Sequence, residues 1–159
     1  MPPGPRTIKI AREFELFVQD FYRSQGFEIV DTAGRKECGL DFIAKKELTR
    51  IGVQVKCNPR RGAGVSAVRQ TLKGHKLYKC TFCHLVVLQD FSRDAVKLAN
   101  QVGQNQVRLI NSEKFMEKLD AGKVEGFRLL QIMAEHAMEN DLIEKVAVRL
   151  HPDDSVFDT

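Results

Sequence analysis

Three polar residues, Asp41, Gln54 and Lys56, interrupt two short apolar segments in the first half of the chain. Apolar residues alternate with others across residues 39–56, which indicates two half-buried strands joined by a charged turn. Gln54 and Lys56 are two positions apart, so on a strand they point to the same face. A carboxylate, an amide and an amine that one hairpin brings together could hold a divalent metal ion and a water molecule.

The elements that must position these residues form an α/β pattern. We expect a helix over 7–25, strands over 27–31, 40–45 and 51–57, a helix over 66–78, a strand over 82–88, a helix over 92–102, a strand over 107–110 and a helix over 112–119. Three consecutive strands favour an antiparallel meander, and strands that alternate with helices favour parallel crossovers. The pattern therefore predicts a mixed β-sheet with helices on both faces.

The chain of 159 residues is long enough for one domain with a buried core. Residues 1–6 are rich in proline and predict a disordered start, residues 7–122 form the expected domain, and residues 123–159 form an acidic helical extension with a frayed tail. No apolar run approaches the roughly 18 residues of a membrane span, and the start does not resemble a secretory signal. We therefore expect a cytoplasmic protein without membrane contact, whose cysteines are reduced thiols.

Charge is distributed unevenly along the chain. Residues 45–79 contain ten Lys or Arg and one acid, whereas residues 124–159 contain three basic residues and eight acids. A basic middle and an acidic end fit a surface that binds a polyanion, followed by a separate extension. The alternative is that these lysines and arginines only solvate the surface.

Several motifs resemble the Mrr-type branch of the PD-(D/E)xK nucleases. They include Phe14-Glu15, Gly26-Phe27, the segment GLDFIA at 39–44, VQVK at 53–56, Val65-Ser66, residues 68–70 and Phe91-Ser92, in order between about residues 10 and 119. The resemblance implies a restriction-endonuclease-like fold and cleavage of DNA phosphodiester bonds with Mg²⁺, for which Mn²⁺ is an expected substitute. Most PD-(D/E)xK enzymes have an acid at the position of Gln54, but the Mrr-type branch has glutamine.

The resemblance also implies roles for individual residues. Asp41 matches the metal-binding acid, Gln54 the second metal-side position, Lys56 the catalytic lysine and Glu15 the acid carried by the first helix. Mg²⁺ prefers oxygen ligands, so the Val55 carbonyl is a further candidate ligand. A structural salt bridge between Asp41 and Lys56, and a solvent-facing Glu15, are the alternatives.

Basic side chains around the hairpin are candidates for contacts with DNA phosphates, which supply affinity but little sequence information. The candidates are Lys45, Lys46, Arg50, Arg60, Arg61, Arg69, Lys73 and Lys76, with Gln70 as a polar position on the same helix as Arg69. Arg60 and Arg61 lie in a glycine-containing loop and are the best candidates to enter a groove. Gln70 can equally be an ordinary exposed helix residue.

Several alternatives remain open from the sequence. The chain could be a Holliday-junction-resolving nuclease, a DNA-binding subunit without catalysis, or a nuclease that acts on RNA. Cys80 and Cys83 form a CxxC pair that could bind zinc with Cys38 or Cys57, but cysteines at the start of an apolar strand often pack as small hydrophobic residues. The acidic extension could dock a partner or a second copy of the chain, forming a homodimer or a larger complex.

Overall fold

The computed structural model describes residues 4–32, 39–57 and 63–150, with side chains described up to residue 141. The first three strands, β1 (Glu28–Asp31), β2 (Phe42–Lys46) and β3 (Thr49–Lys56), pair antiparallel. The last two, β4 (Phe82–Val87) and β5 (Val107–Ile110), extend the sheet in parallel with β3, giving the order β1-β2-β3-β4-β5. The short turn between β2 and β3 permits only an antiparallel pair, whereas the later connections are long enough for crossovers.

Within the described part of the chain, five helices accompany the sheet. They are α1 (Pro5–Ser24), α2 (Val65–Leu77), α3 (Arg93–Val102), α4 (Ser112–Ala121) and α5 (Phe127–Leu150). Helix α1 begins at Pro5 rather than at the predicted Thr7, because proline suits the first helical position, where a missing N–H costs nothing. Ser92 caps α3 as predicted by accepting a hydrogen bond from the Ala95 N–H. The residues that precede α2 and α4 are Gly64 and Asn111, one or two positions before the serines expected there.

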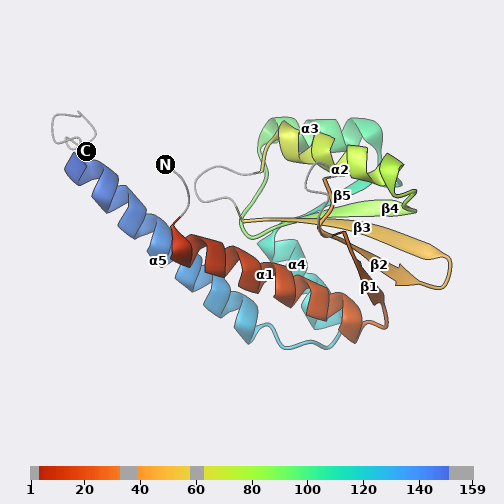
Figure 1. Ribbon diagram of the computed structural model, residues 1–159, viewed down its shortest axis with the longest axis horizontal. Coiled ribbons are helices and arrows are strands. Elements are labelled where there is room, and N and C mark those ends of the chain that lie inside the picture. The colour runs from red at the N-terminus through yellow and green to blue at the C-terminus, as the bar shows by residue number, and fades with distance from the viewer. Residues whose placement is uncertain (1–3, 33–38, 58–62, 151–159) are drawn as a thin grey trace.

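The helices form a layer on each face of the sheet (Figure 1). Helices α1, α4 and α5 cover one face around a core that contains Phe14, Phe42 and Phe115, and α2 and α3 cover the other face around Val68 and Leu85. The predicted α/β architecture, a mixed sheet flanked by helices with a helix at the C-terminal end, is confirmed. No helix among the described residues combines the length and apolar character that crossing a membrane requires.

Helix α5 follows α1 along part of its length and then extends past the sheet (Figure 1). Leu129 and Ile132 near its start are fully buried in the same core as α1. Arg128 also donates a hydrogen bond of 2.9 Å to Glu13 of α1. The start of α5 is therefore part of the packed fold, while the predicted division of the chain at residue 122 stays a prediction.

A buried histidine in β4 is expected to make the fold sensitive to acid. The Tyr22 hydroxyl and His84 Nδ1 share a hydrogen bond of 2.5 Å, and burial lowers the pKa of His84 to about 3. Unfolded histidine takes up a proton near pH 6.5, so stability present at neutral pH is lost as the pH falls from 6.5 towards 3. At pH 5 this one residue should cost about 2 kcal/mol of unfolding free energy.

We expect His84→Gln to remove this dependence, because the glutamine oxygen can accept the Tyr22 hydroxyl and does not titrate. Urea unfolding of wild type and variant at pH 7.5 and pH 5 measures the effect. Between these two pH values the unfolding free energy of the wild type should fall by about 2 kcal/mol more than that of the variant. An equal loss in both proteins would contradict the assignment of the acid sensitivity to His84.

Candidate active site

Asp41 lies where the pairing of β2 with β3 ends. Its backbone N–H donates to the Val53 carbonyl at 2.9 Å, and its Oδ2 accepts from the Val55 N–H at 2.7 Å. The N–H and C=O of one strand residue point to the same side of the strand, so the Val55 carbonyl also faces the side occupied by Asp41. One carboxylate and one backbone carbonyl are thus brought to the same edge of β3.

Lys56 is the last residue of β3 and lies beside this carboxylate. Its carbonyl accepts a hydrogen bond of 3.1 Å from the Leu88 N–H, which ties the end of β3 to the chain that follows β4. The Lys56 side chain is half-buried, and its positive charge acts on Asp41 by lowering the pKa of that carboxyl. The predicted pair of acid and amine is therefore close in space.

Burial nevertheless raises the pKa of Asp41 above its ordinary value. Burial is the largest cause, the Val55 hydrogen bond and the charge of Lys56 oppose it, and the neighbouring Asp31 adds to it. A half-buried carboxylate with a raised pKa is better stabilised by an additional positive charge than an exposed one. The surroundings of Asp41 therefore favour the approach of a cation.

Glu15 of α1 belongs to the same electrostatic group. Burial raises the pKa of Glu15, the charge of Asp41 raises it further, and Arg12 one helical turn earlier lowers it. The sequence placed Glu15 on a helix without showing what it faced. The fold brings it near enough to Asp41 for the two carboxylates to repel each other.

Asp31 is a member of this group that the sequence did not single out. It ends β1 and pairs with Phe42, the residue after Asp41, and its charge raises the pKa of both Asp41 and Glu15. The signal that the sequence offered was an acid placed directly after two apolar residues, at the end of a predicted strand. Its significance depends on the register between β1 and β2, which the sequence does not display.

Gln54 projects from β3 towards α2, and its neighbours determine how its amide is oriented. The amide nitrogen faces the carbonyl oxygens of Ala67 at 3.1 Å and Gly39 at 3.3 Å, and the amide oxygen lies 3.1 Å from the Gln70 side chain. Thr71 completes this contact, because its hydroxyl lies 2.5 Å from the Gln54 amide and donates to the Ala67 carbonyl at 2.8 Å. Gln54 thus joins β3 to α2, and its role as a metal ligand stays a prediction.

Changing Gln54 to glutamate should destabilise the folded protein, although it would introduce the acid that most PD-(D/E)xK enzymes carry at this position. A carboxylate would bring a negative oxygen against the Ala67 and Gly39 carbonyl oxygens and could donate no hydrogen bond to them. We expect Gln54→Glu to lose about 2–3 kcal/mol of unfolding free energy at pH 8, measured by urea denaturation. Gln70→Glu, at the exposed end of the same contact, is the matched control. Equal stability of Gln54→Glu and wild type would show that the amide does not act as a donor here.

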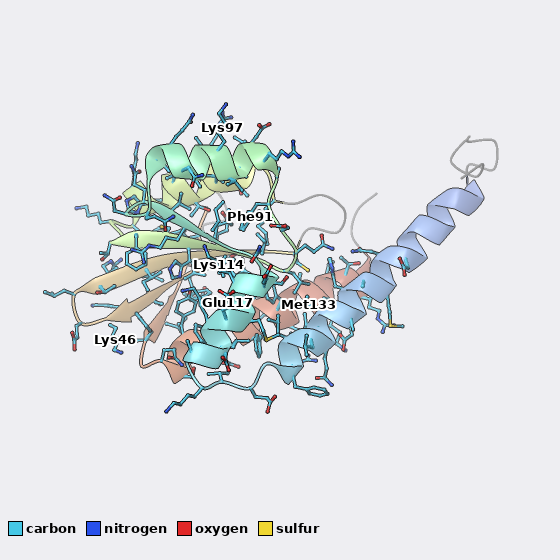
Figure 2. The ribbon with its side chains drawn as sticks, turned by 180° about the vertical axis from the view of Figure 1, so that it is seen from behind. Lys46, Phe91, Lys97, Lys114, Glu117 and Met133 are labelled. Carbon is cyan, nitrogen blue, oxygen red and sulfur yellow. The ribbon has the colours of Figure 1, made fainter. Side chains whose placement is uncertain are left out.

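The predicted DNA-binding residues separate into two groups. Arg69, Gln70, Lys73 and Lys76 are exposed on α2, which begins at the edge of the sheet where β3 ends. Lys45 and Lys46 are at the far end of the hairpin, about 13 Å and about 17 Å from Asp41 by the rise of a strand. Figure 2 shows Lys46 at that end, where its Nζ donates to the Gln25 carbonyl at 3.0 Å.

Arg50 is also near the far end of the hairpin, and its Nη2 donates to the Tyr78 carbonyl at 3.1 Å. Arg60 and Arg61 lie outside the described residues. Of the predicted contacts on α2, Gln70 packs against Gly39, two residues before Asp41, whereas Lys76 lies at the other end of the helix, near the Tyr78 carbonyl that binds Arg50. All of these DNA contacts stay predictions.

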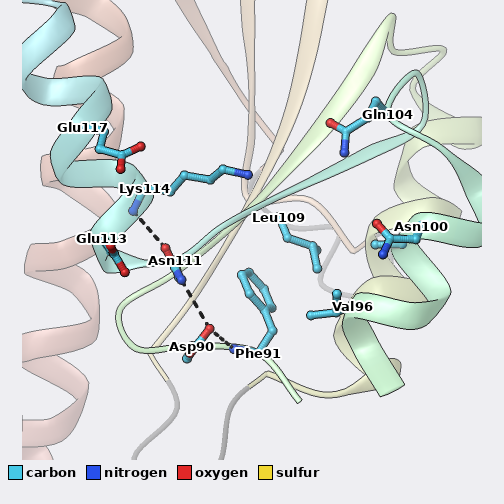
Figure 3. Close-up of a pocket in the computed structure, with 11 residues that line it drawn as sticks. Asp90, Phe91, Val96, Asn100, Gln104, Leu109, Asn111, Glu113, Lys114 and Glu117 are labelled. Atoms are coloured by element: carbon cyan, nitrogen blue, oxygen red, sulfur yellow. Dashed lines mark hydrogen bonds between the residues drawn. The ribbon is translucent and has the colours of Figure 1, made fainter. Parts of the chain in front are cut away.

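Two cavities lie elsewhere on the molecule, and Glu15, Asp41, Gln54 and Lys56 line neither of them. The first, of about 360 Å³, lies between α3 and α4, where Asp90 Oδ1 accepts from the Phe91 N–H and from Asn111 Nδ2 (Figure 3). Its charged lining consists of three acids and one lysine, Asp90, Glu113, Glu117 and Lys114, which does not suit a phosphate. The second, of about 570 Å³, lies between α4 and α5, where Figure 2 shows Glu117 and Met133.

Among the described residues, no three Cys, His, Asp or Glu side chains form a group that could hold a metal ion without other ligands. The described residues therefore provide no complete set of zinc ligands around Cys80 and Cys83. Cys38 lies outside the described part of the chain. A magnesium ion needs fewer protein side chains, because it retains several waters and is bound through one or two carboxylates and substrate phosphates. Asp41, the Val55 carbonyl and Glu15 are compatible with that kind of site.

The chain is similar in fold to solved structures of low sequence identity. The chain has 16% identity to the DNA modification-dependent restriction endonuclease AspBHI with a TM-score of 0.57, over 92% of this chain and 41% of that chain. It has 17% identity to AF1548, a protein of unknown function, with a TM-score of 0.50, over 80% of this chain and 94% of that chain. The MspJI restriction endonuclease in complex with a 27-mer oligonucleotide gives 19% identity and a TM-score of 0.46, over 80% of this chain and 32% of that chain.

These structural similarities concern the fold alone, and this chain spans less than half the length of AspBHI. No curated protein matches the chain. The sequence family described as restriction endonuclease, Mrr catalytic type, matches residues 10–119. This range includes Glu15, Asp41, Gln54 and Lys56 and all five strands of the sheet. The chain therefore belongs to the Mrr-type restriction endonuclease family.

Proposed function

We propose that the chain is a Mg²⁺-dependent DNA endonuclease that hydrolyses phosphodiester bonds. The observation that carries the proposal is the position of the Asp41 carboxylate, held by the Val55 N–H beside Lys56. Glu15 and Asp31 add negative charge to the same place. Carboxylates whose charges act on one another beside one lysine, in a chain of this family, suit a cation and the phosphate that accompanies it.

The candidate metal ligands are Asp41, the Val55 carbonyl and Glu15. Asp41 uses Oδ2 to accept the Val55 N–H, and this contact orients the carboxylate as a whole. Gln54 would supply a neutral oxygen only by leaving its contacts with α2, so we place it in a supporting role. When bound, Mg²⁺ would offset negative charge on the scissile phosphate and favour ionisation of a water molecule.

Lys56 is the residue that would act on the nucleophile. Its ammonium group can hold the attacking water by hydrogen bonding and can stabilise the negative charge that develops on the phosphate oxygens. The backbone contact between Lys56 and Leu88 fixes the end of β3, so the lysine stem starts from a rigid position. The raised pKa values of Asp41 and Glu15 make the unbound site take up protons readily, so cleavage should decline as the pH falls.

DNA would reach this site along α2. Arg69 and Lys73 are one helical turn apart and exposed, so both can contact the phosphates of one strand. These contacts carry no sequence information, and specificity would come from elsewhere. Cleavage of both strands would require a second active site, and a homodimer or a larger complex through the C-terminal helix stays a prediction.

The test is cleavage of supercoiled plasmid and of a synthetic four-way junction, with Mg²⁺ or Mn²⁺, by wild type and by Lys56→Ala. We expect metal-dependent cutting by the wild type and none by the variant. A preference for the plasmid would support a restriction-type enzyme, and a preference for the junction would support a resolving enzyme. Salt-sensitive DNA binding without cutting by either protein would instead indicate a binding subunit.

A further inference from the structure

A pair of cysteines lies on the α2 face of β3, at Gly52. A Cβ added to Gly52 would lie 2.7 Å from Cys83 Sγ and 2.8 Å from Cys80 Sγ, closer than carbon and sulfur atoms can pack. The two sulfur atoms therefore fill the space that a side chain at position 52 would occupy. They converge on one point although the two residues lie on a loop and on β4.

The backbone holds both cysteines in place. The Cys80 N–H donates to the His75 carbonyl at 3.1 Å, and the Cys83 N–H donates to the Gln106 carbonyl at 2.8 Å. The residue between them on the loop, Thr81, donates its N–H to the Arg50 carbonyl at 2.8 Å. Two thiols fixed in this way remain next to each other without a covalent bond between them.

The two thiols differ in their surroundings. Cys80 is half-buried, and Cys83 is fully buried. A hydrogen bond from Cys83 lowers the pKa of Cys80, burial opposes this effect, and the charge of Arg50 and the Gly52 N–H lower the pKa further. The same hydrogen bond, together with burial, raises the pKa of Cys83. The more accessible sulfur is therefore also the one that forms a thiolate more readily, and a thiolate is the reactive form.

His75 of α2 completes the group. Its Nδ1 lies 3.6 Å from Cys83 Sγ, so the imidazole can exchange a proton with the buried thiol. Cys57, by comparison, has a pKa that burial raises to about 11. The pair at positions 80 and 83 thus has a reactive thiol, a neighbouring second thiol and a proton acceptor.

We propose that Cys80 and Cys83 form a redox-active dithiol that a hydroperoxide oxidises to a disulfide within the chain. The Cys80 thiolate attacks one peroxide oxygen, the O–O bond breaks, and the leaving oxygen takes up a proton to become water or an alcohol. Cys80 is then a sulfenic acid. Cys83 gives its proton to His75 and attacks the Cys80 sulfur, forming the S–S bond as hydroxide leaves and is protonated to water. Two electrons pass from the two thiols to the peroxide.

This dithiol is separate from the proposed nuclease site. Gly52 precedes Gln54 on the same face of β3, whereas Asp41 and Lys56 lie beyond Gln54 at the end of the strand. The inference therefore does not depend on DNA cleavage. Cys80, Cys83 and His75 do not form a group that could hold a metal ion, and the other described residues supply no such group either.

The test treats the full chain with hydrogen peroxide, blocks remaining thiols with iodoacetamide, and digests it without reducing agent. Mass spectrometry should find a Cys80–Cys83 disulfide, two hydrogens lighter than the dithiol and abolished by dithiothreitol. Cys57 in the same sample is the internal control, and it should be recovered as an alkylated thiol. In Cys83→Ser, dimedone should trap a sulfenic acid at Cys80, and Cys57→Ser should oxidise like wild type.

The rates distinguish a reactive pair from cysteines in general. We expect Cys80 to be oxidised at least about tenfold faster than Cys57 in the native protein, and this difference should disappear in 6 M guanidinium. The proposal is overturned if Cys80 and Cys57 react at equal rates in the native protein. It is also overturned if both Cys80 and Cys83 are recovered as alkylated thiols after peroxide treatment.

Discussion

Replacing Asp41 with asparagine is expected to reduce metal-dependent DNA cleavage by at least about 10²-fold while making the folded protein more stable. The asparagine oxygen can still accept the Val55 N–H, so the local backbone should be retained. The variant loses only the negative charge that would face the metal ion and the phosphate. Because burial raises the pKa of Asp41, the ionised carboxylate opposes folding, and its removal relieves this cost.

The pH dependence of that stability gain has a definite sign. A carboxyl whose pKa is raised in the folded protein destabilises it above that pKa, and the cost disappears as the pH falls below the unfolded value. The advantage of Asp41→Asn in urea unfolding should therefore be greatest at pH 8 and shrink on acidification. Asp20→Asn, on the exposed surface of α1, is the matched control and should cleave DNA like wild type. Cleavage by Asp41→Asn at the wild-type rate would exclude Asp41 from catalysis.

Replacing Gly39 with alanine should disrupt both the fold and the site. Gly39 has φ of 70°, and a Cβ there would lie 1.9 Å from the Gln70 carbonyl oxygen, which is part of the α2 backbone. The variant would have to move α2 away from the segment that carries Asp41. We expect a loss of about 2–4 kcal/mol in unfolding free energy, together with most of the cleavage activity.

Gly64→Ala provides the matched control for Gly39→Ala. Gly64 precedes α2 with φ of −95°, and a Cβ there would meet no atom within 4 Å. The unfolding free energy of Gly64→Ala, measured by urea denaturation, should remain within about 0.5 kcal/mol of the wild-type value. If Gly39→Ala and Gly64→Ala were equally stable, the close approach of α2 to Gly39 would not be a requirement of the fold.

The contacts of Gln54 explain why an amide can take the place of an acid in this chain. Its amide nitrogen bonds to carbonyl oxygens of two different segments, those of Ala67 and Gly39. A carboxylate has no donor to offer them unless it is protonated. Asp31 and Glu15, rather than position 54, add negative charge near Asp41.

The sequence alone determined the architecture and the hairpin that brings Asp41 and Lys56 together, while their roles stay predictions. Strand periodicity is a local property, so the alternation across residues 39–56 was sufficient to predict the hairpin that carries Asp41 and Lys56. The long connections between the later strands likewise implied the parallel part of the sheet. The Ser92 cap and the bounds of β5 were also correct, because each depends on neighbours in the sequence.

Only the tertiary structure decided which other side chains join that pair. Asp31 became a neighbour of Asp41 through the register of β1 on β2, and Gln54 was bound to α2 through helix packing. Lys45 and Lys46 are close to Asp41 in the sequence, but the direction of β2 carries them to the other end of the hairpin. Contacts between distant segments depend on how elements pack, and no periodicity within one segment encodes them.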